Sequence, residues 1–295
     1  MTDQPFVPIL SLKDGIDADA LFRALTDTGF VVLIDHGIDL SRLENAYASV
    51  EAFFALPEAA KNTYATGTNG QRGYTPFGTE NAKDNPVPDL KEFWHVGRDE
   101  ILPNIWPDQP EDFRSEVAWL YDALDKVGLD LLRALTKPLE IAEDTFDRMA
   151  AGGNSVLRLL HYPPIADDAD PNAVRAAAHE DINLITLLVA ASAAGLELLD
   201  REGKWRAVEA PPNAIIADAG DMLARITNNQ IPATTHRVVN PDGPNVSRYS
   251  MPFFLHPKQE AVLSVFPQYR DGNEAADITG DDFLTERLRE IGLQA

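Results

Sequence analysis

The chain has 295 residues, with 25 Lys and Arg against 47 Asp and Glu, six His and no Cys, so its formal net charge is −22. Hydrophobic residues make up 44%, which is ordinary for globular domains and enough for a substantial core. The acidic balance argues against nucleic-acid and anionic-membrane partners, because both are bound through Lys and Arg. Without Cys there is no disulfide, thiolate nucleophile or Cys-ligated metal, so any metal would take His and carboxylate ligands.

The beginning of the sequence shows no targeting pattern. MTDQPFVPILSLKDG lacks the basic and apolar regions of a secretory signal, and no run of 18 apolar residues occurs anywhere in the chain. We therefore expect a soluble, cytoplasmic protein.

The first part of the chain is predicted to be mainly helical. Apolar residues at helical spacing predict a helix over 18–28, and the β-branched run 29–34 predicts a strand. A second helix is expected over 41–56, where Pro57 closes it. Gly, Pro, Asn and Asp are frequent across 66–110, which indicates a long loop region, and loops of that length are usually functional.

A predicted long helix precedes a region of short β-rich segments. From residue 111, apolar residues recur three or four positions apart, which predicts a helix. After about residue 152, Pro, Gly, Asn and Asp separate short apolar or β-branched runs. These runs are SVLRLLHY (155–162), INLITLLVA (182–190), AIIA (214–217), TTHRVV (234–239) and SRYSMPFFL (247–255). Such strands favour a sandwich or barrel, and the tail over 281–292 has helical spacing.

Two histidines and an acid could form a metal site. His179 and Asp181 are two residues apart, so both point to one face of an extended segment. His236 lies in a separate β-branched run and could be a third ligand. Two His and one carboxylate make the facial triad of non-haem Fe(II) oxygenases, which leaves coordination positions open, whereas a structural zinc site would be closed.

Arg248 and Ser250 are a second pair with the spacing of one strand face. An arginine beside a hydroxyl can bind a carboxylate through charge-assisted hydrogen bonds. The apolar residues 251–255 that follow indicate that Arg248 borders a core, where it needs an anionic partner.

Together these motifs resemble the iron/2-oxoglutarate-dependent dioxygenases of the isopenicillin N synthase-like family. The similar segments follow the family's order: GFVVLIDHGI (29–38), RGYTPFGTE (72–80), DLKEFWHVGR (89–98), LRLLHYPP (157–164), AAHEDINLITLL (177–188), TTHRVVNP (234–241) and SRYSMPFFLHP (247–257). The resemblance implies a mainly β fold with flanking helices, in which a double-stranded β-helix (jelly roll) core carries a helical N-terminal region. It implies one integrated unit with four parts: an accessory region (1–110), a supporting helix and connection (111–150), the catalytic core (151–260) and a helical tail (261–295).

The resemblance also implies roles for individual residues. Three of them would bind Fe(II): His179, Asp181 and His236. Three others would bind the cosubstrate 2-oxoglutarate: Arg248, Ser250 and Tyr162. The implied reaction uses O2 to oxidise, most often hydroxylate, a small molecule, and releases succinate and CO2. Many members have Asn where this chain has Leu160, so one hydrogen bond to 2-oxoglutarate is absent or supplied elsewhere.

The resemblance also points to residues that would contact the substrate. Aromatic and histidine side chains in family pocket segments are candidates: Tyr74, Phe77, Trp94, His95 and His161. The loops at 66–110 and 163–176 would set specificity, but the sequence selects no substrate and no oligomeric state. Three alternatives stay open: an oxidase of the isopenicillin N synthase type that uses no 2-oxoglutarate, a non-catalytic jelly-roll binding protein, and a zinc-dependent hydrolase.

Overall fold

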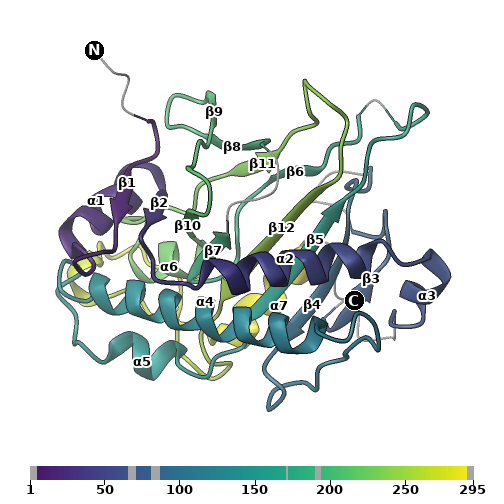
Figure 1. Cartoon of the computed structure of the whole chain (residues 1–295). Helices are drawn as coiled ribbons and strands as arrows, with labels where there is room; N and C mark the ends of the chain where they lie inside the picture. Colours follow the sequence, from purple (N-terminus) through teal and green to yellow (C-terminus); the bar gives the residue numbers. More distant parts are fainter. Residues whose placement is uncertain (1–4, 66–70, 81–86, 171, 190–193, 291–295) are drawn as a thin grey trace.

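The computed structural model describes residues 5–65, 71–80, 87–170, 172–189 and 194–290. Two β-sheets organise this part of the chain (Figure 1). The larger has eight strands in the order β1-β2-β10-β7-β12-β5-β4-β3, and the smaller has four in the order β6-β11-β8-β9.

The larger sheet joins strands from both ends of the chain. Its members are β1 (Ile9–Ser11), β2 (Phe30–Ile34), β3 (Gly73–Thr75), β4 (Glu92–Gly97), β5 (Val156–Tyr162), β7 (Ile185–Val189), β10 (Ile215–Ala219) and β12 (Arg248–Leu255). The smaller sheet contains β6 (Ala176–His179), β8 (Leu196–Leu199), β9 (Trp205–Ala207) and β11 (His236–Val238). The helices are α1 (Ala18–Thr28), α2 (Leu40–Phe54), α3 (Glu58–Asn62), α4 (Phe113–Leu135), α5 (Thr145–Ala150), α6 (Asp221–Ile226), the 3₁₀ turn η1 (Pro267–Tyr269) and α7 (Gly280–Glu290).

The two faces of the larger sheet have different partners. On β5, Leu157 and Leu159 belong to the apolar core that includes residues of α2 and α4, and Figure 1 shows these two helices running side by side. Leu160 and Tyr162 instead pack with residues of the smaller sheet, such as Leu198. We call the face that carries Leu157 and Leu159 the outer face, and the face that carries Leu160 and Tyr162 the inner face.

Short-range signals fix where the early helices begin and end. The Asp17 carboxylate accepts a hydrogen bond from the Ala20 backbone N–H at the start of α1, and Gly29 ends the helix with a φ of 71°. A Cβ at Gly29 would lie 2.2 Å from the Thr234 Oγ1 atom. Only glycine therefore allows this close approach of α1 to the segment that leads into β11.

Most predicted elements are confirmed. The helices expected at 18–28, 41–56, from 111 and at 281–292 correspond to α1, α2, α4 and α7, and the five predicted β-runs correspond to β5, β7, β10, β11 and β12. Residues 190 and 291–292 of these predictions lie outside the described residues. The mainly β fold with flanking helices and facing sheets is also confirmed.

The prediction of a long loop region over 66–110 is wrong in part, because β3 and β4 lie within it. Every residue of β4 is buried, so the strand lacks the alternation that marks a half-exposed strand. Residues 66–70 and 81–86 of the predicted loop are outside the described residues. None of the helices in the described residues is long and apolar enough to cross a bilayer.

Candidate active site

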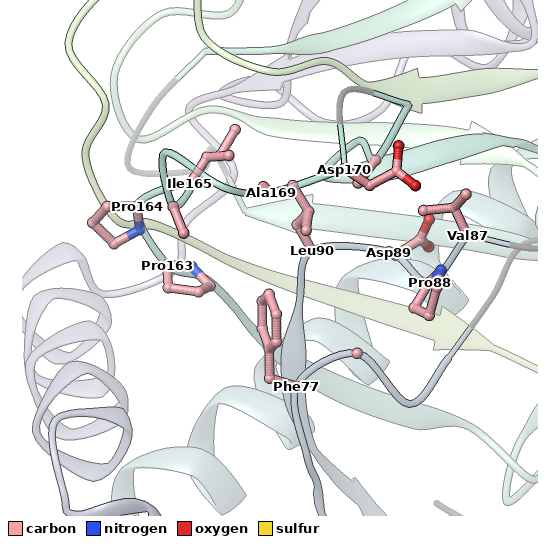
Figure 2. Close-up of a pocket in the computed structure, with 13 residues that line it drawn as sticks. Phe77, Val87, Pro88, Asp89, Leu90, Pro163, Pro164, Ile165, Ala169 and Asp170 are labelled. Carbon is pink, nitrogen blue, oxygen red and sulfur yellow. The ribbon is translucent and has the colours of Figure 1, made fainter.

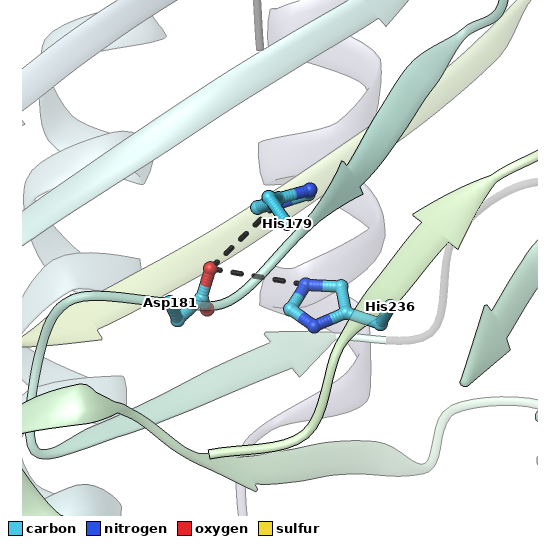
Figure 3. Close-up of side chains that lie close together, drawn as sticks. All are labelled: His179, Asp181 and His236. Carbon is cyan, nitrogen blue, oxygen red and sulfur yellow. Dashed lines mark ion pairs between the residues drawn. The ribbon is translucent and has the colours of Figure 1, made fainter. Parts of the chain in front are cut away.

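The predicted metal ligands come together at the adjoining ends of two paired strands. His179 ends β6 and His236 begins β11, and the two residues are directly opposite in the antiparallel register. The Asp181 Oδ1 atom lies 3.7 Å from His179 Nε2 and 3.8 Å from His236 Nε2 (Figure 3). One ligand atom from each residue lies within 4.8 Å of the other two.

Hydrogen bonds orient both histidines with Nε2 toward Asp181. The Nδ1 atom of His179 lies 2.8 Å from the Ala177 carbonyl oxygen, and that of His236 lies 3.1 Å from the Thr234 carbonyl oxygen. A proton on each Nδ1 satisfies these carbonyls and leaves the Nε2 lone pair free for a metal. Desolvation, and then the neighbouring His236, lower the pKa of His179 to about 4, so the neutral, ligating form is present at pH 7.

The third ligand is also held in place. The Thr186 hydroxyl, on the inner face of β7, donates to Asp181 Oδ2, and the Asn183 side-chain amide donates to the same hydroxyl at 2.9 Å. Asp181 Oδ1 is left facing the histidines. Two imidazole nitrogens and one carboxylate oxygen, converging from one side, fit Fe(II) with open positions on the other side.

Arg248, Ser250 and Tyr162 meet on the inner face of the larger sheet. Arg248 begins β12 opposite Tyr162 of β5, and its guanidinium carbon lies 5.1 Å from the centroid of the Tyr162 ring. All three side chains are buried. Further along the same face of β12, Phe254 pairs with Thr186, which contacts Asp181. The inner face of β12 thus carries the buried Arg248 at one end and, at the other, the residue that pairs with the partner of Asp181.

Leu160 lies opposite Ser250 in this register and is buried with the inner-face cluster. Its side chain has no hydrogen-bonding group. The departure from the family pattern therefore leaves an apolar wall beside Ser250.

A buried ion cluster forms another part of the inner wall. Glu80 Oε1 lies 3.0 Å from Arg158 Nη1 and 2.7 Å from Lys91 Nζ, and Lys91 Nζ also lies 2.8 Å from Asp89 Oδ2. Although burial opposes ionisation, the charges of Arg158 and Lys91 hold the pKa of Glu80 well below its usual value. Glu80 is therefore ionised at neutral pH, and Arg158 and Lys91 lie beside it.

The same cluster supports the strand that carries His179. Asp89 Oδ1 accepts a hydrogen bond of 3.1 Å from the backbone N–H of Ala177, two residues before the metal ligand. This bond connects the ion cluster directly to β6.

The five candidate substrate contacts are not brought together. His95 faces inward and accepts a hydrogen bond of 2.6 Å from Arg158 Nε. Tyr74 and Trp94 belong to the outer-face core, and His161 contacts Glu92 and stacks on Tyr249 at 4.7 Å between ring centroids. These last three candidates lie on the outer face, away from the face that carries Arg158 and Tyr162.

Phe77 lies at a separate pocket of about 470 Å³ (Figure 2). The pocket lies between the segment 87–90 and the segment after β5, where Pro163, Pro164 and Ile165 face Phe77. None of the three metal ligands lines it. Phe77 is 49% exposed, so it is accessible to a ligand in that pocket.

The sequence reasoning missed two kinds of polar residue near the triad. Asp218, on β10, is buried, and burial together with the nearby Asp181 raises its pKa well above the usual value. The signal was an acid inside the apolar run AIIADAG. The Glu80–Lys91 pair gave no such signal, because its members come from a region rich in residue types that are usually exposed to solvent.

Comparisons with known proteins agree with this geometry. A family model described as the N-terminal region of non-haem dioxygenases in morphine synthesis matches residues 8–109, and one described as the 2OG-Fe(II) oxygenase superfamily matches residues 153–257. The 2-oxoglutarate-dependent dioxygenase citB of Monascus ruber is 33% identical, over 91% of this chain and 87% of its own length. The proline hydroxylase buaE of Petromyces alliaceus is 31% identical, over 87% of this chain and 86% of its own.

Solved structures are similar over nearly the whole chain. A 2OG-Fe(II) oxygenase family protein from Caulobacter crescentus has a TM-score of 0.88 and 41% identity, covering 98% of this chain and 100% of its own. A full-length protein of Neurospora crassa, crystallised in complex with alpha-KG (2-oxoglutarate) and thymine, has a TM-score of 0.87 and 27% identity, covering 98% of both chains.

Proposed function

Because the chain belongs to the 2-oxoglutarate–Fe(II) oxygenase superfamily, we propose that it hydroxylates a small organic molecule in the cytoplasm. It is an Fe(II)- and 2-oxoglutarate-dependent dioxygenase with a jelly-roll core. The observation that carries the proposal is the convergence of His179, Asp181 and His236, with ligand atoms within 4.8 Å of one another.

The residues of the site have two roles: one set would hold the metal, and the other would orient the cosubstrate. His179, Asp181 and His236 would hold Fe(II), which, when bound, activates O2 for oxidative decarboxylation of 2-oxoglutarate and oxidation of the substrate. Arg248 and Ser250 would bind the distal carboxylate of 2-oxoglutarate by charge-assisted hydrogen bonds. Tyr162, beside Arg248, limits where that carboxylate can lie, and the buried inner face excludes bulk water.

A small substrate is supported by the neighbouring proteins. The Neurospora crassa structure contains thymine, and one relative is named a proline hydroxylase. The inner wall beside the triad offers this chain's substrate both a polar group, Arg158 with His95, and aromatic surface, Phe93 with Phe254. We propose a molecule that combines a hydrogen-bond acceptor with an apolar part, and no nucleic-acid or membrane partner.

The experiment is a panel of amino acids, nucleobases and small aromatic acids incubated with the Fe(II)-loaded protein, 2-oxoglutarate and O2. Succinate is measured, and the candidate product is examined for a gain of one oxygen atom. A substrate should raise succinate formation above the background and gain one oxygen. Oxygen consumption that proceeds equally well without 2-oxoglutarate would instead indicate the oxidase alternative, which the named relatives do not favour.

A further inference from the structure

A second buried arginine lies at the Arg248 end of the inner face. Arg175 immediately precedes β6, and its side chain is 1% exposed, as is that of Arg248. Its Nη2 donates a hydrogen bond of 2.6 Å to the carbonyl oxygen of Val246, two residues before Arg248. The Arg175 backbone N–H is fixed by the Asn240 side chain at 3.1 Å, so this arginine is held against the start of β12.

Arg175 has unused hydrogen-bonding capacity in this buried position. Its Nε atom is buried and has no hydrogen-bond partner among the residues that the structure describes. Among residues in the described ranges, no carboxylate forms an ion pair with the Arg175 guanidinium. A buried donor without a partner costs about 1–3 kcal/mol, and more when it is charged, which points to a ligand that completes the site.

The electrostatic surroundings point to an anion. Burial lowers the pKa of Arg175, and the charge of Arg248 lowers it further. Two guanidinium groups therefore repel each other in a region with little water. A carboxylate placed between or beside them would relieve both the repulsion and the missing hydrogen bond.

We propose that Arg175 is a second cationic residue of the 2-oxoglutarate pocket, donating through Nε to the distal carboxylate that Arg248 binds. The inference rests on the proposed binding of 2-oxoglutarate at Arg248 and Ser250. It also accounts for the apolar Leu160, because Arg175 adds a donor to a pocket whose wall offers none beside Ser250. In a chain with a net charge of −22, a second local cation helps to attract a dianion.

The test compares 2-oxoglutarate with 2-oxopentanoate, which has the same carbon chain but no distal carboxylate. Dissociation constants are measured by calorimetry on the Fe(II)-loaded protein without O2, for wild type, Arg175→Met and Arg175→Lys. The Met variant should weaken 2-oxoglutarate binding about tenfold or more and leave 2-oxopentanoate binding nearly unchanged. The Lys variant should retain part of the preference, because it keeps the charge but loses the planar donor geometry.

Thermal unfolding separates this role from a purely structural one. If Arg175 only fixes the Val246 segment, Arg175→Met should lower the melting temperature without ligand and leave the 2-oxoglutarate-induced shift unchanged. The proposal expects the opposite: a reduced ligand-induced shift and little loss without ligand, because one of two repelling charges is removed. Arg72→Met is the matched control, since Arg72 is equally buried and donates to the backbone carbonyls of Leu102 and Gln71.

The outcomes separate an error in the role of Arg175 from an error in the position of the pocket. Equal weakening of both ligands by Arg175→Met, or behaviour like that of Arg72→Met, would overturn the proposal for Arg175. Arg248→Leu is run in parallel. If it also leaves the preference for 2-oxoglutarate intact, the pocket itself is misplaced; if it removes the preference while Arg175→Met does not, only the role of Arg175 fails.

Discussion

The outer and inner faces of the larger sheet are built from the same strands but do different work. On β5, Leu157 and Leu159 face the helices and are completely buried in an apolar core. Between and beyond them, Arg158 and Tyr162 face the smaller sheet, where they contact charged groups. Because side chains alternate along a strand, one seven-residue strand supports both the core and the site.

The comparison shows why the polar residues on the inner face are tolerated. The ion cluster near the triad is internally paired, as in the Glu80 contacts with Arg158 and Lys91, since burying an unpaired charge is costly. The outer face also has one such group, in which Lys61 and His161 contact Glu92. There the ions join α3 to the sheet, whereas on the inner face Asp89 joins the ion cluster to β6, two residues before His179.

The largest effect is expected from removing a metal ligand. His179→Ala or Asp181→Ala should abolish turnover and weaken Fe(II) binding by at least about 100-fold, since even supporting residues of metal sites contribute 10–100-fold. Succinate release and metal content after dialysis measure the two effects.

Glu180→Gln is the matched control for the ligand variants. Glu180 lies between the two ligands in sequence, but its carboxylate accepts a hydrogen bond from the Thr235 hydroxyl and is not part of the triad. This variant should keep both metal and turnover. Substantial succinate formation by His179→Ala would mean that the inner face does not hold the metal where we place it.

A smaller, ligand-specific effect is expected at the other end of the inner face. Arg248→Leu should raise the 2-oxoglutarate concentration required for half-maximal turnover about 100-fold, because it removes charge-assisted hydrogen bonds worth about 1.5–3 kcal/mol each. Iron content should not change. A variant that lost iron but kept its 2-oxoglutarate requirement would contradict the assignment of Arg248 to the cosubstrate rather than to the metal.

Two adjacent leucines of β5, Leu159 and Leu160, lie on opposite faces and allow the two faces to be compared directly. Leu159→Ala, at a fully buried outer-face position, should lower the free energy of unfolding by about 2–5 kcal/mol without changing the 2-oxoglutarate requirement. Leu160→Ala, opposite Ser250, should change that requirement. Denaturant unfolding and steady-state kinetics are compared for the pair, and equal kinetic effects would show that the faces are not functionally distinct.

The smallest effect concerns Asp39, the N-cap residue of α2, and the pH dependence of the protein's stability. Hydrogen bonds from the Ser41 hydroxyl and the Arg42 backbone N–H lower the pKa of Asp39 below its usual 3.8. A lowered pKa stabilises the fold above the unfolded-state pKa, and this contribution is lost as the pH falls below it.

Asp39→Asn keeps a good N-cap residue but cannot titrate. It should therefore lose slightly less stability than wild type between about pH 5 and pH 3, with kinetics at pH 7 unchanged. Thermal unfolding across this range measures the difference. A variant that loses as much stability as wild type on acidification would show that Asp39 does not contribute.

The expectation that His236 joins His179 and Asp181 rested on the family resemblance, because the ligands come from separate segments and Asp181 follows the end of β6. The shared face of Arg248 and Ser250, by contrast, followed from local spacing on one strand. Residues two apart on a strand share a face whatever the rest of the fold does. The apolar residues of α4, which recur three or four positions apart, predicted that helix in the same way. β6 was missed because its sequence, AAAH, has little β-propensity; only its pairing with β11 makes it a strand.

Face assignment in buried strands could not be predicted. Trp94 and His95 are neighbours on β4, and both are buried, so no polar alternation tells which points toward the triad. The pairing of β4 with β5 decides it. For the same reason the Glu80–Lys91 contact, between a loop and a strand edge, left no sequence signal, and neither did the closeness of Arg175 to Arg248.

The most direct test of the central claim is a joint measurement of O2 consumed and succinate formed by the Fe(II)-loaded protein. With substrate and 2-oxoglutarate, the two amounts should be equal, and omission of either Fe(II) or 2-oxoglutarate should stop both. O2 consumption without 2-oxoglutarate, or succinate formation by a protein that lacks the His236 imidazole, would contradict the account.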